Sequence, residues 1–357
     1  MSALDLIRPE IRALSAYHVQ HAEGYIKLDA MENPWPLPLA LQERLGEQLA
    51  KAAYNRYPDA NPLVLKALMA KVFGVPEGAA LLLGNGSDEL IQIMAQAVAK
   101  PGAALLSVEP AFVMFRVLAN ACGLEYIGVP LQDNFSIDLE AMLKKIRERQ
   151  PALIFLAIPN NPTGNTFAPE AVQAILKEAK GIVVIDEAYF PFRDGSYLSC
   201  IHHYPNMVVM RTVSKLGLAG IRLGFLAGAP ELLGELEKLR LPYNVSVATQ
   251  VIAETVLQEQ QALSDQTLKL RQERERLFTA LRDIDGVHPF ESEANFILLR
   301  VTDAQAVFDG IKRHGILIKN LSSAHALLRG CLRVTVGTPE ENDRFLDALK
   351  ASMLACA

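Results

Sequence analysis

The sequence RTVSKLGLAGIRLG, residues Arg211–Gly224, is the most informative part of the chain. It comes directly after the apolar run Met207–Met210, which predicts a buried strand, so Lys215 stands just beyond a strand end. A lysine amine becomes a nucleophile only when its pKa falls, through partial burial or a neighbouring cation. Arg222 would provide that cation, and its planar fork of donors also suits a phosphate group. A glycine-rich turn without chemical function is the alternative, and the rest of the chain has to decide between them.

Composition restricts the class of protein. The 357 residues are 50% hydrophobic and 21% charged, which suffices for two domains of ordinary size with large cores. The net charge of -5 gives no reason to expect a nucleic acid or an acidic membrane surface as a partner. The four cysteines show no paired spacing, which argues against a disulfide framework or a metal site and indicates a reducing compartment. With no signal peptide and no bilayer-length apolar run, we expect a cytoplasmic protein without a membrane partner.

The first part of the chain, residues 1–54, is expected to be an N-terminal arm and a helix that join the smaller domain. The stretch Met31–Pro38 contains too many prolines for a helix and must be extended. A helix over Leu39–Ala53 is predicted from apolar residues at a spacing of four. The loop Tyr54–Asp59 then carries two tyrosines and an arginine, a pattern that also fits ordinary surface decoration.

Residues 55–245 alternate short apolar runs with helical segments, which is typical of an α/β domain with a mostly parallel sheet and helices on both faces. The runs expected to be strands are Ala80–Leu83, Ala103–Val108, Ala152–Ile158, Ile182–Ile185, Met207–Met210 and Leu223–Ala227. The helices include Glu89–Ala99, Ile137–Arg149, Pro169–Lys180 and Glu231–Arg240.

Residues 246–357 differ in their pattern of charged and apolar segments and are expected to form a smaller α+β domain. A charged helical segment, Ser264–Leu281, leads into shorter strands, and its charges are most simply a solvated helix face. The expected strands are Asn295–Arg300, Ile316–Lys319 and Cys331–Val336, and the expected helices are Ala304–His314 and Pro339–Leu354.

Ligands of such sheets bind at the carboxyl ends of the strands, so the residues at those ends are the candidates for a site. The first end carries Gly84–Glu89, where glycines and a helix N-terminus could hold an anion or could simply start a helix. Another carries Pro159–Asn165, a rigid turn with two asparagines. A third carries Asp186 and Tyr189, and a carboxylate at a buried strand end is costly without a cationic partner. A bound cationic ring would provide one.

Taken together, these pieces resemble the fold-type-I pyridoxal-phosphate aminotransferases. Asn161 within its proline-bracketed turn, Asp186 with Tyr189, and Lys215 with Arg222 occur in the order typical of that family. Within it the chain is most similar to the histidinol-phosphate aminotransferases. The segments that carry this similarity are Glu32–Pro34, Asn55–Pro58, Gly84–Glu89 and Cys331–Thr338, which span most of the chain.

The resemblance implies pyridoxal 5′-phosphate as the cofactor. It makes Lys215 the residue that forms the Schiff base and shuttles a proton, and Asp186 the partner of the pyridine nitrogen. Asn161 and Tyr189 are implied to bind the phenolic oxygen of the ring, and Phe112 to cover its face. The residues implied to hold the cofactor phosphate are Gly86, Ser87, Thr212, Ser214 and Arg222, with Tyr57 reaching across a homodimer interface so that the active sites are shared.

The resemblance also implies the substrates, histidinol phosphate and 2-oxoglutarate, with glutamate and imidazole acetol phosphate as products. Arg333 would grip the substrate phosphate, and Tyr17 and Asn33 from the arm would close over it. Lys319 departs from the family pattern, because a second arginine usually stands there and lysine lacks bidentate geometry.

Two alternatives remain open from the sequence, and a third is disfavoured. Aromatic amino acids would suit the same transamination chemistry, and a pyridoxal-phosphate lyase or decarboxylase would share every cofactor residue. A pyridoxal-sensing regulator would need a DNA-binding domain, and the chain shows no basic stripe.

Overall fold

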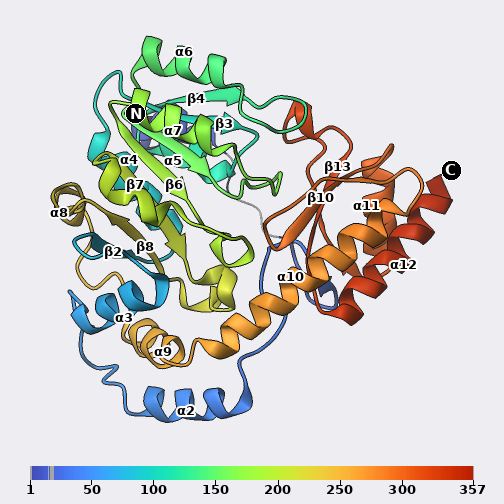
Figure 1. Cartoon of the computed structure of the whole chain (residues 1–357), viewed down its shortest axis with the longest axis horizontal. Coiled ribbons are helices and arrows are strands. Elements are labelled where there is room, and N and C mark those ends of the chain that lie inside the picture. Colours follow the sequence, from blue (N-terminus) through green and yellow to red (C-terminus); the bar gives the residue numbers. More distant parts are fainter. Residues whose placement is uncertain (1, 15, 17–19, 357) are drawn as a thin grey trace.

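The computed structural model describes residues 2–14, 16 and 20–356 and shows two lobes joined by helix α10, Gln261–Arg282 (Figure 1). The larger lobe holds a seven-stranded sheet between helices, and the smaller lobe holds a four-stranded sheet with α11 and α12 beside it. The predicted fold class, an α/β lobe with a smaller α+β lobe, is confirmed. The exact domain borders at residues 54 and 245 stay a prediction.

The large sheet has the strand order β2-β8-β7-β6-β5-β3-β4. Strands β3 to β7 pair in parallel, while β8 is antiparallel to both of its neighbours. Because β5, β6 and β7 are adjacent and parallel, the segments that come after them meet at one edge of the sheet. The strands are β2 Ala80–Gly84, β3 Ala104–Glu109, β4 Glu125–Pro130, β5 Leu153–Ala157, β6 Ile182–Asp186, β7 Met207–Thr212 and β8 Gly224–Gly228.

Successive strand residues point to opposite faces, so the sheet has a core on each side. Leu82 and Phe155 belong to one buried cluster with residues of α4, α5 and α8. Leu83 and Ile154 belong to the other, with residues of α3, α6, α7 and α9. The predicted coverage of both faces is therefore confirmed. The helices are α3 Leu63–Phe73, α4 Ser87–Val98, α5 Val113–Ala121, α6 Leu139–Arg149, α7 Pro169–Glu178, α8 Pro230–Glu237 and α9 Val247–Leu257.

The smaller lobe has its own core between its sheet and the helices α11, Ala304–Arg313, and α12, Pro339–Cys356. Its four strands lie in the order β12-β13-β10-β9, all antiparallel. In this ladder Lys319 is the direct cross-strand partner of Arg333, which places two cations side by side. The strands are β9 His288–Pro289, β10 Phe296–Arg300, β12 Lys319–Asn320 and β13 Cys331–Thr335.

The N-terminal segment runs from one lobe to the other. Strand β1, Ile26–Lys27, pairs in parallel with β11, Ile316–Leu317, in the smaller lobe. Helix α2, Leu39–Ala50, ends three residues earlier than predicted and lies below α9 in Figure 1. The first turns are the short helices η1, Ala3–Leu6, and α1, Pro9–Arg12.

One predicted strand needs correction. The run Ile316–Lys319 is not a single strand, because it is split into β11 and β12, which belong to different sheets. Ile318 lies between them and is buried in the small-lobe core, so the chain turns there without losing its apolar contact.

Candidate active site

Residues at or just after the carboxyl ends of five strands, β2, β3, β5, β6 and β7, line one cavity of about 340 Å³. It lies at the edge of the sheet where β5, β6 and β7 end, and the arm residues Ala30–Glu32 close one side. The predicted site residues that line it are Ser87, Phe112, Asn161, Asp186, Tyr189, Thr212, Ser214, Lys215 and Arg222.

Lys215 lies in the 3-10 turn Ser214–Leu216 just after β7. Its Nζ donates a hydrogen bond to the carbonyl oxygen of Ala30 at 3.2 Å. Burial lowers the pKa of the Lys215 amine to about 8, and the charge of Arg333 contributes more to this than that of Arg222. The sequence had suggested Arg222 as the neighbouring cation. In the structure Arg333, from the smaller lobe, lowers the Lys215 pKa more than Arg222 does. An amine with this pKa is partly neutral near physiological pH, as a nucleophile or base requires.

Asp186 is the last residue of β6 and is 5% exposed. Its Oδ1 accepts a hydrogen bond from the backbone N–H of Ala188 at 3.0 Å. Burial raises the pKa of Asp186 to about 7, the nearby carboxylates of Asp88 and Glu187 act in the same direction, and Lys215 opposes them. The negative charge of this buried carboxylate is only partly balanced by the protein. A protonated pyridine ring in the cavity would supply the missing positive charge.

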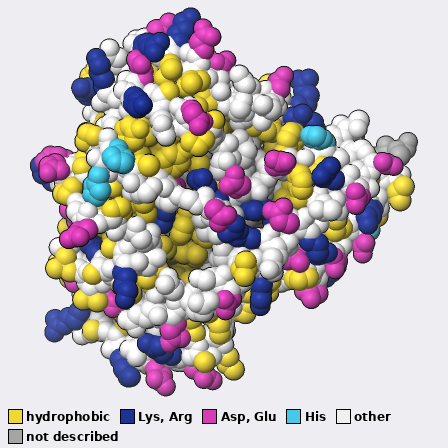
Figure 2. Space-filling view, viewed as in Figure 1, with side chains coloured by type: hydrophobic (Ala, Val, Ile, Leu, Met, Phe, Trp, Pro, Cys, Tyr) yellow, Lys and Arg dark blue, Asp and Glu magenta, His cyan; other side chains and the backbone are white. Residues whose placement is uncertain are grey.

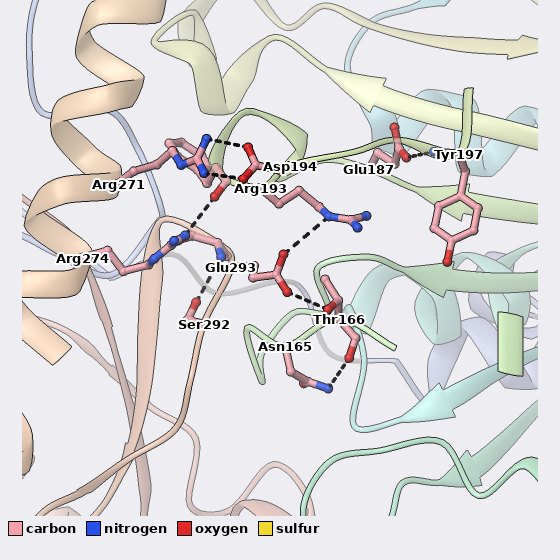
Figure 3. Close-up of polar contacts among 12 residues, drawn as sticks. Asn165, Thr166, Glu187, Arg193, Asp194, Tyr197, Arg271, Arg274, Ser292 and Glu293 are labelled. Atoms are coloured by element: carbon pink, nitrogen blue, oxygen red, sulfur yellow. Dashed lines mark hydrogen bonds and ion pairs between the residues drawn. The ribbon is translucent and has the colours of Figure 1, made fainter. Parts of the chain in front are cut away.

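A buried ion pair fixes the strand ends beside Asp186. Glu187 is fully buried, and its Oε2 accepts hydrogen bonds from Arg211 Nε at 2.9 Å and Nη2 at 2.8 Å. Its carboxylate also accepts from Ser196 Oγ and from the backbone N–H of Tyr197, the latter drawn in Figure 3. Because removing either partner would leave a buried charge, this pair holds the ends of β6 and β7 in register.

Asn161, Tyr189 and Arg333 form a chain of hydrogen bonds between the lobes. Asn161 Nδ2 donates to Tyr189 Oη at 3.0 Å, and its Oδ1 accepts from Arg333 Nη1 at 2.5 Å. Arg333 Nη2 also donates to the carbonyl oxygen of Asp29 at 3.1 Å. The chain therefore connects the turn after β5, the turn after β6 and strand β13 at one wall of the cavity.

The N-terminus of the 12-residue helix α4 has a geometry suited to an anion. Its N-cap is Gly86, at φ 81°, and no side chain caps the helix there. The first N–H groups of the helix are thus available to a ligand, and the helix dipole favours a negative one. A Cβ on Gly86 would lie 2.5 Å from Arg222 Nη2, so glycine makes room for the guanidinium.

Two hydroxyls complete this anion site. Thr212 Oγ1 donates to Ser214 Oγ at 2.9 Å, and both side chains are buried in the cavity wall. The donor set of backbone N–H groups, hydroxyls and arginine fits a phosphate group. Asp88 also lies here, and its carboxylate contacts Arg222 Nη2 at 3.3 Å.

A second cavity, of about 290 Å³, adjoins the first, and Met31, Phe112 and Asn161 line both. The second cavity is lined by Lys319 and Arg333 together with Glu109, Arg116 and other residues. Lys319 and Arg333, the two cations predicted to bind the substrate, thus line the same cavity as Asn161.

Two of the predicted side chains line neither cavity, and a third is not described. Asn33 lines neither cavity, and its Nδ2 donates to Gln266 Oε1 at 2.9 Å and to the carbonyl oxygen of Leu216. Tyr57 is 80% exposed and stacks on Tyr243 with ring centres 4.5 Å apart. Tyr17 lies outside the described residues.

Sequence reasoning missed several residues of the two cavities. Glu32 and Asp88 line the first, and Glu109, Tyr126 and His325 line the second. Glu109 ends β3, so the rule of inspecting strand ends could have found it. Tyr126 lies on β4, an edge strand in which only Ile127 and Val129 are buried, so it gave a weak apolar pattern.

The two lobes also meet through a polar junction beside the site (Figure 3). Glu293 of the smaller lobe accepts a hydrogen bond from Thr166 Oγ1 at 2.7 Å and lies 3.7 Å from Arg193 Nε. Thr166 and Arg193 come just after the turns that carry Asn161 and Tyr189, so one carboxylate connects both turns to the smaller lobe. Figure 2 shows charged side chains of both signs in the middle of this face, where the lobes meet.

Membrane-spanning helices and metal clusters are both absent from the described part of the chain. No helix within residues 2–14, 16 and 20–356 is both long and apolar enough to cross a bilayer. The same residues contain no cluster of three or more His, Cys, Asp or Glu side chains placed to hold a metal ion.

Comparisons with known proteins agree with this geometry. The family model of the class I and II aminotransferases matches residues 23–349. The chain is 49% identical, over 98% of both chains, to the histidinol-phosphate aminotransferase of Chromobacterium violaceum. The crystal structure of histidinol-phosphate aminotransferase from Sinorhizobium meliloti, in complex with pyridoxal-5′-phosphate, has a TM-score of 0.89, 25% identity and full coverage of both chains.

One further solved structure shares the fold alone. It is L-threonine-O-3-phosphate decarboxylase from Porphyromonas gingivalis, at 22% identity and a TM-score of 0.78, which covers 92% of this chain and 99% of that one. The 49% identity to the Chromobacterium violaceum aminotransferase favours transamination over decarboxylation. The chain belongs to the class I and II aminotransferases and, within them, to the histidinol-phosphate aminotransferases.

Proposed function

We propose that this enzyme transfers the amino group of L-histidinol phosphate to 2-oxoglutarate, yielding imidazole acetol phosphate and glutamate in histidine biosynthesis. Family membership supports the reaction and pyridoxal 5′-phosphate as the cofactor. One observation carries the assignment to this cavity: Lys215, with its lowered pKa, and the buried Asp186 both line it beside an uncapped helix N-terminus. When bound, the cofactor withdraws electrons from the substrate carbon that loses its proton.

Lys215 has two tasks in this proposal. Its Nζ would hold the cofactor covalently, and as a free amine it would accept the proton of the substrate carbon. The pKa of about 8 supports both tasks, because a share of the amine is neutral at physiological pH. Tyr189 lies beside it, with its ring centre 5.8 Å from Nζ.

Asp186 would face the pyridine nitrogen and keep a proton on it. Its buried position, with the pKa raised to about 7, supports this role, since the carboxylate gains most from a cation placed against it. Asn161 and Tyr189, already joined by a hydrogen bond, would bind the phenolic oxygen, and Phe112 would cover the ring. The cofactor phosphate would be held by Gly86, Ser87, Thr212, Ser214 and Arg222.

The substrate phosphate would occupy the second cavity against Arg333 and Lys319. These cations are cross-strand partners, and Arg333 already donates to Asn161 at the boundary with the first cavity. Tyr17 and Asn33 stay predictions as residues that close over the substrate. The hydrogen bonds of Asn33 to Gln266 and Leu216 give it a structural role as well.

We also propose a homodimer with shared active sites. Tyr57 lies outside the cavity of its own chain and stacks on Tyr243. Leu63 and Val64, close to Tyr57 in sequence, are exposed, and so are Leu241 and Tyr243 in the segment that Tyr57 contacts. Exposed apolar side chains of this number indicate a surface that another chain covers. A cytoplasmic location is part of the same proposal.

A substrate comparison tests the proposed reaction. The purified enzyme is supplied with 2-oxoglutarate and, separately, with histidinol phosphate, phenylalanine, tyrosine or threonine phosphate. We expect glutamate to form with the highest kcat/KM from histidinol phosphate. Equal rates with phenylalanine or tyrosine would favour an aromatic aminotransferase, and carbon dioxide released from threonine phosphate without a keto acid would favour a decarboxylase.

A further inference from the structure

We propose that His325 donates a hydrogen bond to the substrate phosphate and completes the site formed by Arg333 and Lys319. This makes His325 a specificity-determining residue for phosphorylated substrates. The inference rests on the proposed function, because it takes the phosphate of histidinol phosphate as the ligand.

The position of His325 supports this role. It lies in the loop between β12 and β13, the two strands that carry Lys319 and Arg333. All three side chains line the same cavity of about 290 Å³. The loop thus brings an imidazole to the place where the two cations are paired across the ladder.

The hydrogen bond of His325 indicates which of its two ring nitrogens carries the proton in the neutral form. His325 Nδ1 accepts from the backbone N–H of Leu327 at 3.2 Å, which caps the 3-10 turn Ala326–Leu328. A nitrogen that accepts carries no proton, so the neutral ring bears its proton on Nε2. Within the described part of the chain no side chain or carbonyl accepts a hydrogen bond from Nε2. The ring is therefore held by one nitrogen and offers the other as a donor.

The charged groups of this cavity offer few directional donors to a phosphate. Arg116 is bound to Glu109, so these two charges largely offset each other. Both terminal nitrogens of Arg333 already donate to Asn161 and Asp29, and Lys319 is a point charge that cannot bind two oxygens in a fixed geometry. A phosphate monoester presents three terminal oxygens, and the Nε2–H of His325 would give the third a directional partner.

Capping of the 3-10 turn is the purely structural explanation of His325, and His325→Asn separates the two roles. Asparagine keeps a side-chain oxygen for the N–H of Leu327, because it is among the preferred capping residues. It lacks an atom in the place of Nε2. The holoenzymes are compared by KM and kcat for histidinol phosphate and for histidinol, and by calorimetric binding of glycerol 3-phosphate, which has no amine to react.

We expect His325→Asn to raise KM for histidinol phosphate and the Kd for glycerol 3-phosphate about tenfold. The kcat and the KM for histidinol should stay within about twofold of wild type. The melting temperature should stay within a few degrees of wild type. Adding Lys319→Arg should restore much of the affinity, since a second fork replaces the lost donor.

Two results would overturn the inference. One is an unchanged Kd and KM for the phosphorylated ligands, and the other is an equal loss with histidinol and histidinol phosphate, which would make His325 a capping residue only. A wild-type enzyme that does not transaminate histidinol phosphate would instead refute the proposed function, so the two failures are distinguishable.

Discussion

Asp186 is a carboxylate placed where water cannot stabilise its charge. Because its pKa in the folded state, about 7, lies above the ordinary value of 3.8, the folded protein binds the proton more tightly than the unfolded chain. The free energy of unfolding therefore falls as the pH rises from about 4 to 7, and the penalty is fully present above pH 7. This holds for the cofactor-free protein, which has no pyridinium to compensate.

We predict that Asp186→Asn stabilises the cofactor-free protein at pH 8 by about 1–3 kcal/mol, after the cost of an unpaired amide. The gain should shrink as the pH is lowered toward 4, and thermal denaturation at pH 5 and pH 8 measures it. With cofactor bound, the same variant should turn over about 10²- to 10³-fold more slowly, as loss of a buried charge partner implies. Normal turnover would show that Asp186 does not face the cofactor.

Arg333 lies in the smaller lobe but acts on the site in two ways, through its hydrogen bond to Asn161 and its charge beside Lys215. We predict that Arg333→Leu reduces kcat/KM for histidinol phosphate at least about tenfold more than for histidinol, because only the former presents a phosphate. Arg333→Lys serves as the control that keeps the charge and loses the fork. Equal losses with both substrates would leave Arg333 a structural role only.

At the residue scale, the sequence predicted the features that local position determines. Lys215 and Asp186 could be found because each stands at the end of a buried strand, and strand ends meet at one edge of the sheet. The pairing of Arg333 with Asn161 could not be found this way, because 172 residues separate them. The sequence also could not show that Arg333 influences the Lys215 pKa more than Arg222 does, because this depends on distances between the lobes.

The turn into α4 provides the prediction at the scale of secondary-structure elements. Gly86→Ala would place a methyl group 2.5 Å from Arg222 Nη2, at a backbone φ of 81° that alanine disfavours. We expect a loss of about 1–3 kcal/mol in stability and a cofactor Kd raised about tenfold or more. The second effect is due to displacement of Arg222, and a spectrophotometric titration of the cofactor-free protein measures it.

Gly74→Ala is the matched control. Gly74 also has a positive φ, 65°, at the end of α3, but an added Cβ would meet nothing within 4 Å. It should lose about 1 kcal/mol in stability and bind cofactor normally. A cofactor affinity that falls equally in both variants would show that backbone strain, not Arg222, is responsible.

Elements with a strong apolar pattern were predicted from the sequence, and those with weak patterns were not. Strand β4 was missed because Glu125–Pro130 is an edge strand with exposed ends and only two buried residues, Ile127 and Val129. The split of Ile316–Lys319 into two sheets was missed because its apolar run continues through the bend at Ile318. In both cases the partner strand, rather than the local sequence, determines the structure.

At the scale of the whole molecule, Tyr57 is the test of shared sites, since it is exposed and stacked on Tyr243 of the same chain. We predict that mixing Lys215→Ala with Tyr57→Phe chains raises activity, at limiting cofactor, above that of either parent. In a mixed dimer with Tyr57 acting on the partner's site, one site carries both defects and the other is intact. A hydrogen bond from a phenol to a phosphate is worth about 1.5–3 kcal/mol, so the parent defect is measurable.

The control for this experiment is chain exchange, confirmed by native mass spectrometry. A flat activity curve with exchange complete would contradict the shared-site proposal. The sequence suggested this arrangement only through family resemblance, because sequence patterns do not show which surface a partner chain covers.

Lys215 is the residue on which the whole proposed site depends, as the covalent anchor of the cofactor. The measurement that tests this role is borohydride reduction of the holoenzyme, with proteolysis and mass spectrometry of the labelled peptide. We predict a pyridoxyl label on Lys215 and no other lysine, with Lys215→Ala folded, unlabelled and without the visible absorption of the bound cofactor. A label on any other lysine of the wild-type enzyme, or a labelled and active Lys215→Ala variant, would contradict it.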